Sequence, residues 1–135
     1  MHETSKMISI PIGEETLNFR ISKLDAFSGA RLLKLLSLFQ EKSEEGKAFS
    51  LSDFMFSLSD PEFEQVIKVC LAHAEVQLPA GFIPVYRNDC WGMPDLEYET
   101  MACLKLTLEV MAWSLSGFFP GNGRSSPPGE EASSL

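Results

Sequence analysis

The sequence has few of the residues, and none of the motifs, on which enzymes depend. Its 135 residues include only two histidines. No glycine-rich phosphate loop, G-x-S-x-G nucleophile elbow, H-E-x-x-H motif or EF-hand loop occurs in it. His73 lies on the flank of a helical pattern, without the positioned partners that a general base needs. We therefore predict that the protein is not an enzyme and has no catalytic residues.

Cysteine is also too scarce to build a disulfide framework or a zinc site. Of Cys70, Cys90 and Cys103, one stays unpaired in any disulfide scheme, and two lie at apolar positions of predicted helices. Cys70 and His73 can share one helix face, but a structural zinc site needs four ligands and the sequence has no second close pair. We expect reduced thiols, no metal site and no cofactor.

Basic residues are outnumbered by acidic ones, 11 against 19, and the formal net charge is −8. Because phosphate neutralisation supplies most nucleic-acid affinity, and the sequence has no basic cluster, we expect no binding to DNA, RNA or an anionic membrane. An acidic DNA mimic, or a regulatory adaptor for a basic partner, stays open as an alternative.

Long hydrophobic runs are missing as well. The first residues, 1–6, are polar and show no secretory signal, and the apolar stretch 104–119 is interrupted by Lys105 and Glu109. The apolar content of 44% is that of a globular chain, and 135 residues suffice for one domain with a core. We expect a cytoplasmic protein.

Two alternating segments near the N-terminus predict a β-hairpin. Ile8, Ile10 and Ile12 alternate with other residues, and the alternation resumes after the turn and continues to Ile21. Pro11 has no backbone N–H to donate, so the first strand should lie at the edge of a sheet.

Helical patterns dominate the segment that follows. We expect helices at residues 24–42, 51–59 and 61–75. Asp60 should cap the third of these helices, with Pro61 as its first residue.

The segment 76–94 contains three prolines and two glycines, which exclude a long helix. We expect this segment to be irregular, apart from a brief extended piece at 82–86. From Pro94 to about Gly117, the pattern predicts a long terminal helix.

The terminal helix should be apolar on two faces. Its first apolar row consists of Met101, Leu104, Leu108, Met111, Leu115 and Phe118. Its second row, about 200° around the helix, consists of Cys103, Leu106, Val110 and Trp113. One face can pack on the domain, whereas the other needs another helix, a second subunit or a client protein.

These patterns together predict a mainly α fold with a small N-terminal β-hairpin (α+β). We expect a single compact helical domain at residues 1–119. Residues 120–135 should form a disordered Gly/Pro/Ser-rich tail, because they contain almost nothing to bury.

The order of these elements resembles the tail assembly chaperones of long-tailed, siphovirus-type bacteriophages and prophages. The segment from Ile8 to Arg20 and the terminal helix, which ends in Leu115-Ser116-Gly117-Phe118-Phe119, carry most of the likeness. The resemblance implies a protein-binding chaperone in the host-cell cytoplasm that coats the tape-measure protein and helps recruit tail-tube subunits during tail morphogenesis. It implies no nucleotide or metal. Family members are often also made as a longer frameshifted product, which in this chain could extend from the tail.

Exposed apolar helix faces on an acidic body suit such a chaperone. We predict that contacts with the tape-measure protein, or with sister subunits of a homo-oligomer, involve Leu35, Leu36, Phe39, Met111, Trp113, Phe118 and Phe119. Two rival hypotheses stay open. An acidic adaptor or DNA mimic should bind a basic partner with an affinity that falls steeply with salt. A small enzyme would need an apolar pocket with convergent polar groups.

Overall fold

The computed structural model describes residues 4–42 and 50–116. Within them the chain forms four α-helices, one 3₁₀ helix and six strands. In chain order these are β1 (Ser5–Ile12), β2 (Glu15–Ser22), α1 (Ala26–Lys42), α2 (Leu51–Ser57), α3 (Asp60–Ala72), β3 (Ala74–Leu78), β4 (Gly81–Pro84), β5 (Tyr86–Arg87), β6 (Cys90–Trp91), η1 (Pro94–Tyr98) and α4 (Thr100–Ser114). The predicted tail, residues 120–135, lies outside the described residues.

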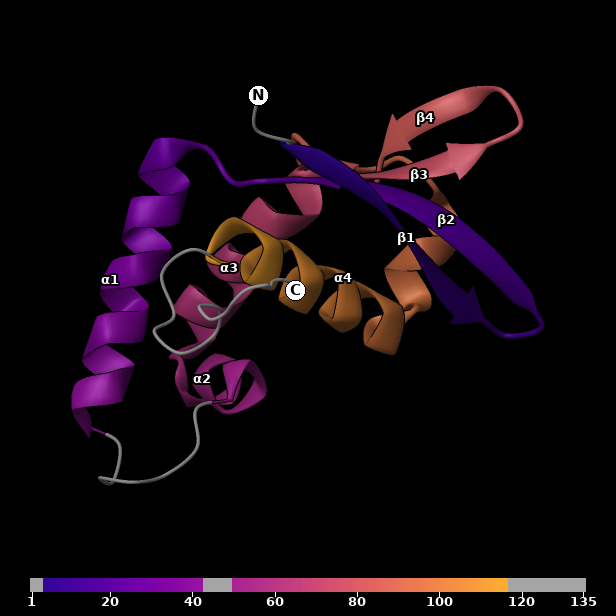
Figure 1. Ribbon diagram of the computed structural model, residues 1–135. Helices are drawn as coiled ribbons and strands as arrows, with labels where there is room; N and C mark the ends of the chain where they lie inside the picture. The colour runs from indigo at the N-terminus through magenta and orange to yellow at the C-terminus, as the bar shows by residue number, and fades with distance from the viewer. Residues whose placement is uncertain (1–3, 43–49, 117–135) are drawn as a thin grey trace, which may run out of the picture.

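Four of the strands form one antiparallel sheet in the order β1-β2-β3-β4, and β5 pairs with β6 separately. The prediction of a mainly α fold with one small N-terminal hairpin is therefore wrong. β3 begins at Ala74, within the helix predicted for 61–75, and continues into the segment that was expected to be irregular. β4 overlaps the brief extended piece that was expected at 82–86. Because β3 pairs with β2, the N-terminal hairpin and this second hairpin make a single sheet (Figure 1).

The proline and glycine residues of the second hairpin stand at the ends of its strands. Pro79 and Ala80 form the turn, and Gly81 begins β4 with a φ of 131°. Pro84 ends β4, which is an edge strand and therefore tolerates a residue without an N–H donor. The pattern excludes a helix correctly, but it does not distinguish an irregular loop from a short hairpin.

The predicted N-terminal hairpin is confirmed. β1 and β2 pair over their full lengths, and Gly13 occupies the turn with a φ of 63°. β1 lies at the edge of the sheet, as Pro11 predicts. Ile10, Phe19 and Ile21 are buried, so the alternating pattern corresponds to one face of the sheet packed on the core.

The helices begin close to their predicted positions, but α3 has a different cap. Ser59, rather than Asp60, caps it: Ser59 Oγ accepts a hydrogen bond from Glu62 N at 3.3 Å, and Ser59 N donates to Glu62 Oε1 at 3.2 Å. This reciprocal capping box satisfies two backbone donors at once, which a lone aspartate cap does not. Asp60 therefore begins the helix, and Pro61 follows in its first turn.

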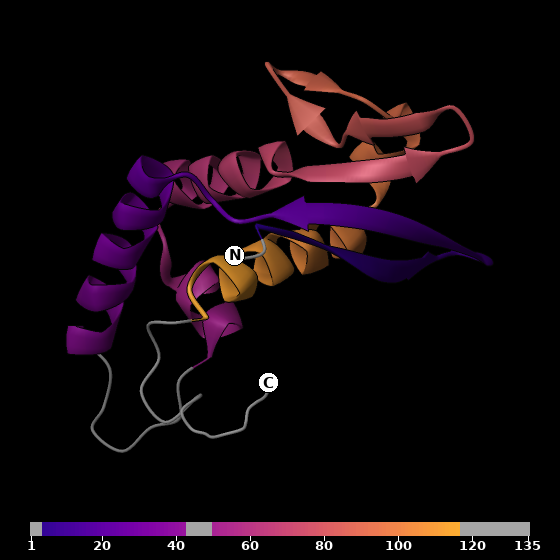
Figure 2. The same ribbon diagram turned by 45° about the horizontal axis from the view of Figure 1, so that its top comes forward.

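The terminal helix is shorter than predicted, because Glu99 has a ψ of 74° and separates η1 from α4. α4 lies beneath the sheet and contacts β1, β2, α2 and α3 (Figures 1 and 2). Leu106, Val110 and Met111 are fully buried there. Neighbours within the same chain therefore cover much of both apolar faces, which is one of the alternatives that the sequence leaves open.

α1 stands at one side of the molecule (Figures 1 and 2). Leu32 and Leu36 enter the core, and the ring of Phe39 packs edge-on against Phe54 of α2 with 5.7 Å between centroids. These contacts hold α1 along one face, and α3 lies beside that face.

Candidate functional site

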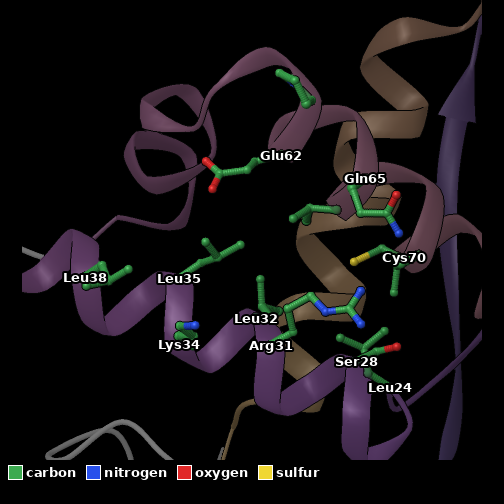
Figure 3. Close-up of a pocket in the computed structure, with 13 residues that line it drawn as sticks. Leu24, Ser28, Arg31, Leu32, Lys34, Leu35, Leu38, Glu62, Gln65 and Cys70 are labelled. Atoms are coloured by element: carbon green, nitrogen blue, oxygen red, sulfur yellow. The ribbon is translucent and has the colours of Figure 1, made fainter.

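A groove of about 460 Å³ lies between α1 and α3, and we call it the α1–α3 groove (Figure 3). Its walls carry apolar residues at helical spacing, leucines on the α1 side and Val66 and Val69 on the α3 side. The apolar lining includes Leu24, Leu32, Leu35, Leu38, Val66 and Val69. Leu32 and Val66 are buried and form the floor, whereas Leu38 has an exposed fraction of 45%. The groove therefore presents aliphatic side chains to solvent.

Charged side chains lie mainly on the α1 wall of this groove. Arg31 and Lys34 are exposed there, about one helical turn apart, whereas α3 contributes Glu62 and Gln65. Figure 3 shows the Arg31 guanidinium extending towards the end of the groove at which Gln65 lies. Two cations and one carboxylate give the lining a formal charge of +1, in a chain whose net charge is −8.

Hydrogen bonds around Asp25 fix one end of the α1–α3 groove. The Asp25 carboxylate accepts a hydrogen bond from Ser28 N at 3.1 Å and lies 3.5 Å from His73 Nε2. Leu24 N donates to Ser114 Oγ of α4 at 2.9 Å. The hydrogen bond from Ser28 holds the pKa of Asp25 below its ordinary value. These contacts tie the start of α1 to the ends of α3 and α4.

Cys70 lines the α1–α3 groove, but its thiol is not reactive. Its side chain is buried, and burial raises the pKa of the thiol to about 12. Almost none of it is thiolate at neutral pH, and the thiolate is the nucleophilic form. Cys70 therefore acts as a packing residue of the groove.

A second groove, of about 470 Å³, is formed by β1, α2 and α4, and we call it the α2–α4 groove. Its rim carries Phe56 and Met101, with exposed fractions of 69% and 78%. Met101, Leu104 and Leu108 of the first predicted row of the terminal helix line it, together with Lys105. Part of the apolar surplus predicted for that helix is therefore still open to solvent here.

The predicted contact residues on α1, with Met111 of α4, divide between core and surface. Leu36 and Met111 are buried, with exposed fractions of 2% and 0%. Leu35 is partly exposed and lines the α1–α3 groove, and Phe39 is partly buried against Phe54. A partner can therefore reach Leu35 without a rearrangement, whereas Leu36 and Met111 serve the core of this structure.

The remaining predicted contacts are Trp113, Phe118 and Phe119. Trp113 does not line the α1–α3 groove; the Nζ atoms of Lys6 and Lys23 each lie 4.8 Å from the centroid of its ring. These are cation–π contacts near the C-terminal end of α4, where positive charge also complements the helix dipole. Phe118 and Phe119 lie outside the described residues.

Sequence reasoning missed Arg31, Lys34 and Leu38 as lining residues of the α1–α3 groove. Leu38 follows Leu35 at the i, i+3 spacing of one helix face, which was the available signal. The two basic residues carry no such signal, because their place in a groove depends on how α1 lies against α3.

The described residues contain neither a membrane span nor a metal site. No helix in the two described ranges combines the length and the apolarity that crossing a bilayer requires. In the same part of the chain, no three His, Cys, Asp or Glu side chains gather closely enough to hold a metal ion.

A family model matches residues 36–126, and its family is described as phage tail assembly chaperone protein, TAC. The matched region begins within α1 and runs through α4, whereas the N-terminal hairpin lies outside it. No curated protein and no solved structure matches the chain. Because the match covers well over half of the sequence, the chain belongs to the phage tail assembly chaperone family, as the resemblance predicts, and its general role lies in phage tail assembly.

Proposed function

We propose that the protein binds the tape-measure protein and helps recruit tail-tube subunits during tail morphogenesis. The family supports a role in tail assembly, and the α1–α3 groove supports a helical client. An amphipathic helix recognises a groove of this kind by laying its apolar face between the walls. The observation that carries the proposal is the solvent-exposed, leucine-lined groove on an acidic chain.

The groove offers a driving force for such binding. Leu35 and Leu38 are partly exposed, and covering apolar surface stabilises a complex by roughly 25 cal/mol per Å² before the entropy of association is subtracted. The net charge of −8 keeps the chaperone, and a complex that contains it, in solution. An aggregation-prone helical client would therefore gain both a cover for its apolar face and a soluble carrier.

Co-expression with a candidate tape-measure protein tests the proposal. The full-length chaperone should form a soluble complex, detected by pull-down and light scattering, that persists at high salt. Apolar contacts are not screened by ions, whereas binding of a basic partner by an acidic adaptor would weaken steeply. If the tape-measure protein aggregated regardless and no complex formed, the proposed function would be rejected.

Recruitment of tail-tube subunits needs a separate measurement. Purified tail-tube protein is added to the tape-measure protein with and without the chaperone, and sedimentation measures the mass of the assemblies. We expect tube subunits to join the tape-measure protein faster, or at lower concentration, when the chaperone is present. Equal rates with and without the chaperone would remove this part of the proposal.

A further inference from the structure

We propose that the α1–α3 groove selects a client helix whose apolar stripe is flanked on one side by carboxylates that face Arg31 and Lys34. This inference rests on the proposed function, because it states the chemistry of the client segment. The inference also fixes how the client helix is oriented in the groove. The acidic flank of the client lies along α1, and the other flank of the client lies along α3.

The two walls differ in the charge that they can offer. Arg31 and Lys34 lie on the α1 wall, and neither forms a salt bridge with any described residue. On the α3 wall, one oxygen of the Glu62 carboxylate is engaged, because Oε1 accepts the hydrogen bond from Ser59 N in the capping box. Gln65, the other polar residue of this wall, is uncharged. Glu62 keeps its negative charge, but the two cations of α1 outnumber this single carboxylate, so the charges that a bound helix meets favour carboxylates on its α1 side.

The spacing of these residues fits a helical client. Arg31 and Lys34 are three positions apart and border the lining leucines Leu32 and Leu35 on the same helix. A client helix that places apolar side chains between the walls carries its flanking residues at the same i, i+3 or i, i+4 intervals. Two client carboxylates, one turn apart, can then meet the two cations at once.

Local and long-range electrostatics oppose each other here, and their ranges decide which dominates. The net charge of −8 repels an acidic client from a distance. At physiological salt the Debye length is about 8 Å, so charges spread over the surface are largely screened while contact pairs are not. Covering the groove also excludes water and strengthens the pairs. We therefore expect the local attraction of carboxylates to exceed the long-range repulsion at physiological salt. At low salt, the preference for carboxylates should become smaller.

Two designed helical peptides test this inference against the full-length protein. Both carry the same leucine stripe, but one is flanked by glutamate and the other by lysine, and fluorescence anisotropy at about 0.15 M salt measures their affinities. We expect the wild type to bind the glutamate peptide about three- to tenfold more tightly than the lysine peptide. In Lys34→Glu this preference should disappear or reverse.

Lys105→Glu is the matched control. Lys105 is also an exposed lysine on a helix and lines the α2–α4 groove, so both substitutions change the net charge equally. The control should keep the wild-type preference, and circular dichroism should show both variants folded. If Lys34→Glu and Lys105→Glu shifted the preference equally, net charge would explain it and the inference would be overturned.

The remaining outcomes separate this inference from the proposed function. Wild-type protein that prefers the lysine peptide, or binds both peptides equally, overturns the inference while a complex with the tape-measure protein still supports the function. Failure of both peptides to bind, alongside a soluble tape-measure complex, also overturns it, because the client then uses another surface. Absence of the tape-measure complex rejects the function itself.

Discussion

The two grooves have nearly equal volumes, about 460 and 470 Å³, but different walls. The apolar lining of the α1–α3 groove consists mostly of leucines and valines, and Arg31 and Lys34 lie on one side of it. The α2–α4 groove includes methionines and the edge strand, and its rim carries Phe56 and Met101. Methionine adapts to many shapes, whereas leucine and valine hold better-defined rotamers. Equal volume therefore does not imply equal selectivity, and we expect the α1–α3 groove to be the selective one.

The largest expected effects are losses of stability when buried residues at the floors of the grooves are truncated. We expect losses of similar size at the two floors. Leu32 of the α1–α3 groove and Met55 of the α2–α4 groove are both buried members of the core. Leu32→Ala and Met55→Ala should each lower the free energy of unfolding by about 2–5 kcal/mol, because each leaves a cavity. Urea denaturation followed by circular dichroism measures the loss. A much smaller loss at one site would show that its floor is loosely packed.

Substitutions on the two rims should differ in how much they weaken binding of the tape-measure protein. This difference is the central test of the comparison. Leu38 on the α1–α3 rim and Phe56 on the α2–α4 rim are both exposed apolar residues. Leu38→Asp should weaken the tape-measure complex by about 30-fold, because binding would bury a carboxylate in an apolar groove. Phe56→Asp should leave the affinity within about threefold. Titration calorimetry with the tape-measure fragment measures both.

Stability measurements provide the control for the rim variants. Leu38→Asp replaces an exposed side chain and should leave the melting temperature close to that of the wild type. Phe56→Asp should lower it slightly, because the Phe56 ring also lies 5.9 Å from that of Phe63 between centroids. If Phe56→Asp abolished binding and Leu38→Asp did not, the assignment of the two grooves would be the reverse of ours.

The helices that border the grooves begin with different caps, which predicts a smaller effect. Ser59 caps α3 in a reciprocal box with Glu62, whereas at the start of α2 Ser50 Oγ accepts one hydrogen bond, from Asp53 N at 3.2 Å. Ser59→Ala should lower the free energy of unfolding by about 1–2 kcal/mol, and Ser50→Ala by about 0.5–1 kcal/mol. Equal losses in denaturation experiments would indicate that the reciprocal bond to Glu62 adds nothing.

Local signals predicted the parts of the fold that depend on neighbouring residues. The alternation around Ile10 and Phe19 predicted the first hairpin, and the spacing of Val66 and Cys70 predicted the buried face of α3. Of the second hairpin only a brief extended piece at 82–86 was predicted, because its strands have just five and four residues. Pairing of Val76 with Phe19 of β2, far away in the sequence, holds them in the sheet. That pairing is a property of the tertiary structure and leaves little periodicity in so short a strand.

The candidate site was predicted only in part for the same reason. Leu35 was predicted as a contact and lines the α1–α3 groove, but Leu36, its neighbour in sequence, is buried in the core. A helix that is apolar around much of its circumference does not reveal which row faces the core and which row faces a groove. The place of Arg31 and Lys34 beside that groove depends on the packing of α1 against α3, which no pattern in α1 alone encodes.

The smallest expected effect is a pH dependence at the fixed end of the α1–α3 groove. The Asp25 pKa lies below its ordinary value of 3.8, chiefly because Ser28 N donates a hydrogen bond to the carboxylate. At a pH near 3.8, the folded protein therefore binds fewer protons at Asp25 than the unfolded chain does. Asp25 contributes stability that is present above the unfolded pKa and is lost as the pH falls through the folded pKa.

Asp25→Asn isolates this contribution, because asparagine caps a helix about as well as aspartate but does not titrate. Between about pH 5 and pH 3, the wild type should lose more stability than the variant, as measured by thermal denaturation at a series of pH values. The other carboxylates titrate in both proteins and cancel in the difference. Parallel losses would mean that the hydrogen bond from Ser28 does not favour the charged carboxylate, and acid would then not loosen the start of α1 through this residue.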